Sequence, residues 1–311
     1  MSPLTSASIA LTGISEWKGR SDGIVAHVFF KGSPNFALSV FAFGVEGWMF
    51  YSAVNSVTPQ IVLNLGFENN AWSISIRQLA YSLTSLFASI PITLYATKYK
   101  DLKSPLIVTF VIFLVVSICY ACISPAWNKA QIGFNVLSGL GQSGPLTLLV
   151  AAVQFTAPHA FLSTATGLAF SARAIGGAFG SAVIDAIING YIGSHYASSI
   201  TETATAAGLP ASSVPGLLEA LSTGSAAAFA AVPGLNPTVL EQVLNTSHWV
   251  YANAYRRAWA SVVPFVVLAL VCVTLLKGVK ELMTEKVEAT VEPESHIGEK
   301  GKEMQMEDRT V

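Results

Sequence analysis

The sequence predicts an all-α transmembrane protein with six membrane-spanning helices. Hydrophobic residues make up 52% of the 311 residues and charged residues only 11%, whereas charged residues average about 25% in soluble domains. Six apolar stretches are each near or above the ~20 residues that a helix needs to cross the hydrocarbon core of a bilayer. Most charged residues lie between or outside these stretches. We therefore expect the chain to be embedded in a membrane, in contact with lipid.

The six spans follow one another along the chain. They cover residues 36–57, 71–97, 104–123, 132–153, 161–192 and 258–276, within one transmembrane domain over residues 36–278. Pro91 lies in the second span and Pro264 in the sixth, and membrane helices tolerate such prolines better than soluble helices do. Residues 1–35 form a separate polar segment. It is not a cleavable signal peptide, because Glu16, Lys18 and Arg20 stand where an apolar core is needed.

The basic residues predict the orientation of the spans. Twelve of the 17 lie on three segments that would share one side: Lys18, Arg20 and Lys31; Lys98, Lys100 and Lys103; and Lys277, Lys280, Lys286, Lys300, Lys302 and Arg309. Segments rich in Lys and Arg remain in the cytoplasm. Both termini are therefore expected to be cytoplasmic, in a multi-pass protein of the plasma membrane or, as an alternative, of the vacuole or another endomembrane.

A long outer loop is predicted over residues 193–255. It contains no Lys or Arg, and it carries Asn245-Thr246-Ser247, the acceptor pattern for N-glycosylation. Two stretches, 215–221 and 237–244, are expected to be short surface helices that each begin at a proline. Arg256 and Arg257 are expected to anchor the sixth span at the outer interface. Residues 279–311 are expected to form a disordered cytoplasmic tail, since the chain from Val287 is charged and lacks aromatic residues.

Composition argues against several other classes of protein. The net charge of −1 gives no basic surface for nucleic acid. Cys119, Cys122 and Cys272 lie in apolar runs without a metal-ligand spacing to histidine, so no metal site is predicted. The sequence also shows no nucleophile–base pair and no phosphate-binding loop. It therefore predicts neither an enzyme nor a cofactor.

Two charges fall near the middle of spans, where an ionised side chain is costly and usually functional. Glu46 lies near the middle of the first span and is the best candidate for proton coupling, with a protonated structural carboxyl as the alternative. Arg173 lies in the fifth span and is either a cavity residue or a structural cation. If the six spans stand alone, we expect both charges to lie on an exposed inner wall.

Other polar residues are weaker candidates. Asp185 lies about 18 Å along the helix from Arg173 and about 120° around it, so the two cannot pair, and Asp185 is expected at the outer interface or a cavity mouth. Arg77 is expected to extend to the outer interface. Gln142 and Asn135 are candidates for lining a cavity or for helix packing.

Small residues of the fifth span fall on two helix faces. One face carries Gly167, Ser171, Ala174, Ala178 and Ser181; the other carries Gly176, Gly177 and Gly180 beside Arg173. Small residues let a second helix approach closely in a membrane. This pattern predicts a helix held between two neighbours.

The most distinctive stretch covers residues 158–187 and reads PHAFLSTATGLAFSARAIGGAFGSAVIDAI. Its proline, its A-T-G-L at 165–168 and its R-A-I-G-G-A-F-G at 173–180 resemble the penultimate helix of fungal fourteen-helix major facilitator transporters. The closest similarity is to the branch of trichothecene-type toxin efflux pumps and siderophore–iron transporters. Stretches within 16–30, 254–265 and 282–292 are similar to the same branch, in the same order. The run 139–145 is similar to an antiporter motif of the superfamily but lies on a different helix, so that role is not transferred.

This resemblance implies a C-terminal six-helix bundle of a secondary active transporter, with cargo held between two bundles. The implied function is proton-coupled efflux of a toxin or drug, or handling of a siderophore. The chain is then expected to be a truncated C-terminal half, whose partner is another six- or eight-helix bundle and whose cargo is a small molecule. Two alternatives are a membrane protein that regulates a full transporter and a homodimeric half-transporter.

Overall fold

The computed structural model describes residue 29 and residues 34–158 and 161–283, and every element within them is helical. Six helices are long and apolar enough to cross a membrane, as predicted. The first is a continuous helix made of α2 (Asn35–Gly47), η2 (Trp48–Val57) and α3 (Thr58–Asn64). The others are α4 (Ala71–Tyr99), α5 (Lys103–Ala121), α6 (Asn128–Thr156), α7 (Leu162–Ala206) and α10 (Pro237–Leu275). Most of the predicted N-terminal segment and tail lie outside the described residues.

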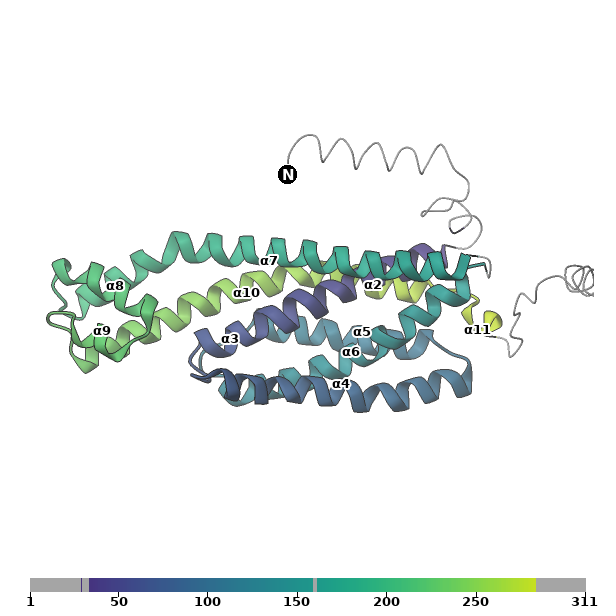
Figure 1. Cartoon of the computed structure of the whole chain (residues 1–311), viewed down its shortest axis with the longest axis horizontal. Helices are drawn as coiled ribbons and strands as arrows, with labels where there is room; N and C mark the ends of the chain where they lie inside the picture. Colours follow the sequence, from purple (N-terminus) through teal and green to yellow (C-terminus); the bar gives the residue numbers. More distant parts are fainter. Residues whose placement is uncertain (1–28, 30–33, 159–160, 284–311) are drawn as a thin grey trace, which may run out of the picture.

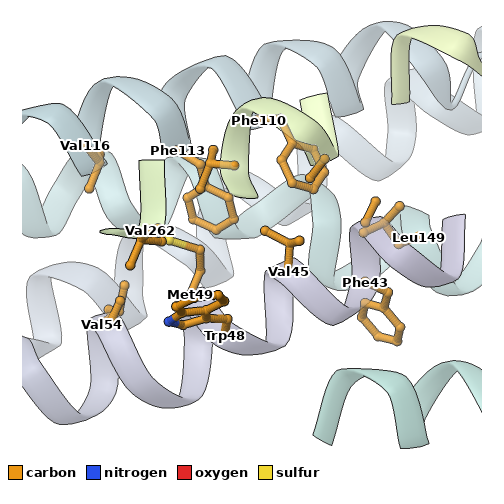
Figure 2. Packing of buried hydrophobic residues seen from close by; sticks show 14 of the residues in the cluster. Phe43, Val45, Trp48, Met49, Val54, Phe110, Phe113, Val116, Leu149 and Val262 are labelled. Carbon is orange, nitrogen blue, oxygen red and sulfur yellow. The ribbon is translucent and has the colours of Figure 1, made fainter. Parts of the chain in front are cut away.

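The first span forms the centre of the bundle. It packs against α6, α7 and α10, whereas α4 packs mainly on α6, and α5 lies between α6 and α10. Figure 2 shows Phe43, Val45 and Met49 of this span meeting Phe113 of α5 and Leu149 of α6 in the core. By contrast, α4 exposes a row of large apolar side chains: Trp72, Ile76, Leu79, Leu83, Leu86, Phe87, Ile90 and Leu94. This is the chemistry of a face that contacts lipid.

The middle of the first span is a π-helix. Over the ten residues of η2 the backbone turns are wider than in an α-helix. Two side chains satisfy carbonyl groups five residues earlier: Asn55 Nδ2 donates to Phe50 O at 2.7 Å, and Thr58 Oγ1 donates to Ala53 O at 3.3 Å. π-Helical turns are rare and occur often at functional sites. This one begins two residues after Glu46.

The region from 193 to 255 is mainly helical rather than a loop. α7 continues to Ala206 and α10 already begins at Pro237, with 45 and 39 residues respectively. At 1.5 Å per residue they are about 68 and 58 Å long, roughly twice the ~30 Å of a bilayer core. Figure 1 shows both extending beyond the bundle, with α8 (Val214–Thr223) and α9 (Ala226–Ala230) at the tip. We call this part, residues 193–255, the extension.

The extension is helical because it has its own apolar core. Ile200, Leu217 and Val243 are fully buried in it, together with six smaller or less buried neighbours. The helix predicted at 215–221 is α8, with its proline in the first turn. The helix predicted at 237–244 begins at Pro237 as expected but does not end at 244, because it continues as α10 into the bundle.

Each end of the bundle is closed by contacts between distant segments. At the lysine-rich end, Asn35 Nδ2 donates to Lys277 O at 2.5 Å, and Lys103 Nζ donates to Leu276 O at 3.0 Å. At the extension end, Arg256 Nε donates to Ile123 O at 2.6 Å. These bonds fix α10 against α2 and α5.

Candidate functional site: a buried ion pair at mid-span

An ion pair joins α2 to α7 inside the bundle. Arg173 Nε lies 2.5 Å from Glu46 Oε2, and Arg173 Nη2 donates to Glu46 Oε1 at 2.9 Å. This two-point geometry is the strong form of a guanidinium–carboxylate contact. Glu46 is fully buried and Arg173 is only 7% exposed. Both charges are therefore enclosed by protein, not displayed on an exposed wall as expected from the sequence.

A third helix also reaches the carboxylate. Gln142 of α6 is fully buried, and its Nε2 donates to Glu46 Oε1. Three spans, α2, α6 and α7, thus meet at one carboxyl group. Gln142 Oε1 has no hydrogen-bond partner among the described residues. A buried acceptor without a hydrogen-bond partner is costly in free energy. This one lies beside Glu46, the residue predicted from the sequence as the candidate for proton coupling.

Aromatic rings surround the guanidinium group. The Arg173 Cζ atom lies 4.6 Å from the centre of the Phe50 ring, 5.1 Å from that of Tyr51 and 5.4 Å from that of Phe43. Arg173 Nη1 also donates to Tyr51 Oη at 3.4 Å. Aromatic faces attract cations, most strongly where water is excluded. Because Tyr51 is 45% exposed, it connects the buried pair to the surface of the bundle.

Glycines bring α7 close enough for this pairing. A side chain at Gly176 would meet the carbonyl oxygen of Gly44, and one at Gly47 would meet that of Arg173. Gly177 and Gly180 make room for the rings of Tyr51 and Trp48. Ser52 Oγ adds a hydrogen bond of 2.8 Å to Gly177 O. The glycine face beside Arg173 therefore packs on α2 and η2.

The second small-residue face of α7 is different. Gly167 has no atom within 4 Å of the position that a side chain would take, and Ser171, Ala174 and Ala178 are exposed. Ser181, on the same face, is partly buried and shares a hydrogen bond of 2.9 Å with Ser52 of η2. The predicted second face is therefore in contact with a helix at Ser181 but open at Gly167.

The remaining candidates lie away from the ion pair. Asn135 is fully buried, but it accepts a hydrogen bond from Tyr120 at 2.9 Å and donates to Arg77 O at 3.0 Å, nearer the extension end. Arg77 does not simply extend to the interface, because it pairs with Glu68 at 2.7 Å. Asp185 is exposed on α7, and Asn245 is exposed on α10 within the extension.

Sequence reasoning found both charges but missed that they pair. The partners are 127 residues apart, and no local pattern connects them. One signal was available: two opposite charges near mid-span each need a partner in an apolar medium. The aromatic surroundings of Arg173 were also missed, because they depend on how η2 faces α7.

Comparison with known proteins finds similarity to membrane transporters of fungi. Residues 13–294 match the family model described as "Fungal trichothecene efflux pump (TRI12)". The chain is similar to "MFS-type transporter prx5" of Penicillium rubens, with 24% identity over 254 residues, or 81% of this chain and 46% of that protein. The chain thus spans about half the length of this curated relative. No solved structure gave a significant match.

Proposed function

Because the chain belongs to the fungal trichothecene efflux pump family of the major facilitator superfamily, we propose that it forms one bundle of a proton-coupled exporter. The family consists of transporters, so the chain is a multi-pass membrane protein and not an enzyme. The cargo is a small molecule of the toxin, drug or siderophore class. A second helical bundle completes the cargo site, since transporters of this superfamily hold cargo between two halves.

The observation that carries this proposal is the Glu46–Arg173 pair. It lies where α2 and α7 are in direct contact, and secondary transporters bind cargo and coupling ions near the middle of the membrane. Glu46 is the one carboxyl group among the described residues that is both fully buried and bonded to a cation. A proton bound there would therefore change the contact between α2 and α7.

The coupling step follows from the contacts of each partner. Protonation of Glu46 neutralises the carboxylate and removes its attraction for Arg173. Arg173 retains the hydroxyl group of Tyr51 and the faces of Phe50 and Phe43. Gln142 still reaches the neutral carboxyl group from α6. The charged link between α2 and α7 is then absent, and the two helices can shift relative to each other.

The test requires both bundles in one protein. A fusion that places the N-terminal half of the Penicillium rubens relative before this chain would supply the second bundle. In liposomes, an imposed proton gradient should drive transport of a trichothecene or a fluorescent drug, and an uncoupler should abolish it. The double variant Glu46→Gln/Arg173→Met removes both charges together and should transport at the same rate with or without the gradient.

Glu68→Gln is the matched control, because it breaks an ion pair at the rim of the bundle and should leave coupling intact. If the double variant still responds fully to the gradient, the buried pair is structural and does not couple protons. Uncoupler-sensitive transport by this chain without the fusion partner would contradict the two-bundle assembly and favour a homodimer.

A further inference from the structure

A pocket lies between α4 and α6 at the lysine-rich end of the bundle. Its volume is about 360 Å³, within the range of about 300–1,000 Å³ found for ligand pockets. Ala96 of α4 and Leu148 of α6 line it and are buried, whereas Phe155, near the end of α6, lines it and is 37% exposed. Lys100, the residue that follows α4, lines it too. We call it the α4–α6 pocket.

The chain itself already reaches this pocket. After α10 the backbone turns at Gly278, whose φ of +68° is the left-handed conformation that favours glycine. The short helix α11 (Val279–Leu282) then packs on α6, at the end of the bundle opposite the extension (Figure 1). Val279 is buried, and Met283 lines the pocket and packs against the core. The residues after Met283 therefore continue directly from the lining of the pocket.

The sequence after Met283 continues the spacing of the residues that pack. Val279, Met283, Val287 and Val291 follow one another at intervals of four, and residues four apart lie on the same face of a helix. Pro293 comes next, and helices usually end before a proline. The pattern predicts a short helix that extends the packed face of α11. We call residues 284–292 the acidic segment.

The end of the molecule that holds the pocket is positively charged. Among the described residues it carries two carboxylates, Asp101 and Glu281, and five lysines: Lys98, Lys100, Lys103, Lys277 and Lys280. Burial would raise the pKa of Asp101, but hydrogen bonds from Ser104 and Lys103 and the charge of Lys280 hold this pKa below its usual value. The lysine of α11 thus acts on the turn between α4 and α5. Such charges attract a negative segment over about 8–10 Å at ordinary ionic strength.

The acidic segment complements this charge. It has one cation, Lys286, and three carboxylates, Glu285, Glu288 and Glu292, which share a second helix face at spacings of three and four residues. The chain before α2 does not offer the same match. Residues 1–33 carry more basic than acidic side chains: Lys18, Arg20 and Lys31 against Glu16 and Asp22. Charge therefore favours the acidic segment as the occupant.

We propose that the acidic segment docks as a helix on the α4–α6 pocket of its own chain. Val287 enters the pocket and covers Phe155, and the carboxylates lie beside the lysines. Only three residues separate Val287 from Met283, and a short tether gives an effective concentration in the millimolar range, so weak contacts suffice. The docked segment holds α4 and α6 together at this end. This inference is independent of the proposed transport function, because it rests on the pocket, the spacing and the charges.

The experiment uses the full chain in nanodiscs of phosphatidylcholine, a lipid without net charge. Photoreactive benzoylphenylalanine replaces Val287 or, as a matched control, Ala289, which lies about 200° further around a helix. After illumination, mass spectrometry locates the cross-links. The probe at 287 should react within the same chain with peptides that contain Ala96, Ala151 or Phe155, and the probe at 289 should not.

Charge variants test the electrostatic part without changing the bundle. With the probe at 287, the triple variant Glu285→Gln/Glu288→Gln/Glu292→Gln should lower the cross-link yield about threefold, the combined effect of three weak surface ion pairs. Glu299→Gln/Glu303→Gln/Glu307→Gln removes the same number of charges beyond the acidic segment and should leave the yield unchanged. Raising the salt from about 0.01 to 1 M shortens the screening length from about 30 to 3 Å and should lower the yield only where the three carboxylates are present.

A pocket variant tests the apolar part. Ala151→Trp fills the pocket and should abolish the cross-links from 287, whereas Val136→Trp, on an exposed part of α6 outside the pocket, should not. If Ala151→Trp does not fold, the charge variants decide alone. Equal reaction of the probes at 287 and 289, or an unchanged yield in the triple variant of the acidic segment, would overturn the proposal. Cross-links from 287 to a second copy of the chain, or to lipid only, would overturn it as well.

Discussion

At the scale of single residues, the cost of burying charge explains the site. An ionised side chain at the bilayer centre costs about 2.5–3.5 kcal/mol on insertion scales. Glu46 and Arg173 offset this cost through a two-point contact, and Gln142 adds a further hydrogen bond. Removing one charge of the pair and removing both have different costs in the free energy of unfolding. Removing both charges can be nearly neutral, whereas removing one leaves the other buried and unpaired.

This asymmetry predicts the stability of three variants. Glu46→Gln should lower the free energy of unfolding by about 3–5 kcal/mol, because Arg173 loses its counter-charge. The double variant Glu46→Gln/Arg173→Met should recover most of that loss. Glu68→Gln should cost less than about 1 kcal/mol, since its pair with Arg77 is partly exposed. Thermal unfolding in detergent, followed by size-exclusion chromatography, measures all three, and a double variant no more stable than Glu46→Gln would contradict the argument.

At the scale of helices, α7 depends on close approach along one face only. A side chain at Gly176 would meet backbone of α2, which cannot move aside as a flexible side chain can. A side chain at Gly167 would meet open space. The two glycines lie on the same helix and differ mainly in their surroundings, so they form a controlled comparison.

Gly176→Ala should therefore destabilise the bundle by about 1–3 kcal/mol, the usual cost of overpacking. Gly167→Ala should be neutral or stabilising by up to about 1 kcal/mol, because alanine favours the helix more than glycine does. The same unfolding assay measures both variants. Equal destabilisation by the two substitutions would show that the α2–α7 contact is not as close as described.

The helices also show how far the sequence could predict this fold. The six spans follow from apolar length, which is the dominant signal for a membrane helix. The continuation of α7 beyond residue 192 and the helix over residues 245–257 of α10 were not predicted, because a helix outside the bilayer needs no apolar run. Residues 193–206 of α7 are rich in Ala, Ser and Thr. The π-helix was also missed, since it has no compositional signal. Charge and depth identified Glu46 and Arg173, but their pairing depends on the arrangement of the helices.

At the scale of the whole molecule, the two ends differ in charge. The extension contains three carboxylates, Glu202, Glu219 and Glu241, and no Lys or Arg. The opposite end carries Lys98, Lys100, Lys103, Lys277 and Lys280. Since lysine-rich segments remain in the cytoplasm, we propose that the extension projects from the outer or lumenal side.

Two natural residues can report this orientation. Asn245 is exposed on the extension and should be glycosylated, giving a band that shifts on endoglycosidase treatment and is lost in Asn245→Gln.

Cys122 is exposed at the end of α5, next to the Ile123 carbonyl that Arg256 binds. A membrane-impermeant maleimide added to intact cells should therefore label Cys122, provided that the chain reaches the cell surface. Cys122→Ser should remove the label, because Cys119 and Cys272 lie within spans and are partly buried. If Cys122 reacts only after the cells are opened and Asn245 carries no glycan in microsomes, the extension lies in the cytoplasm and the charge rule fails for this chain.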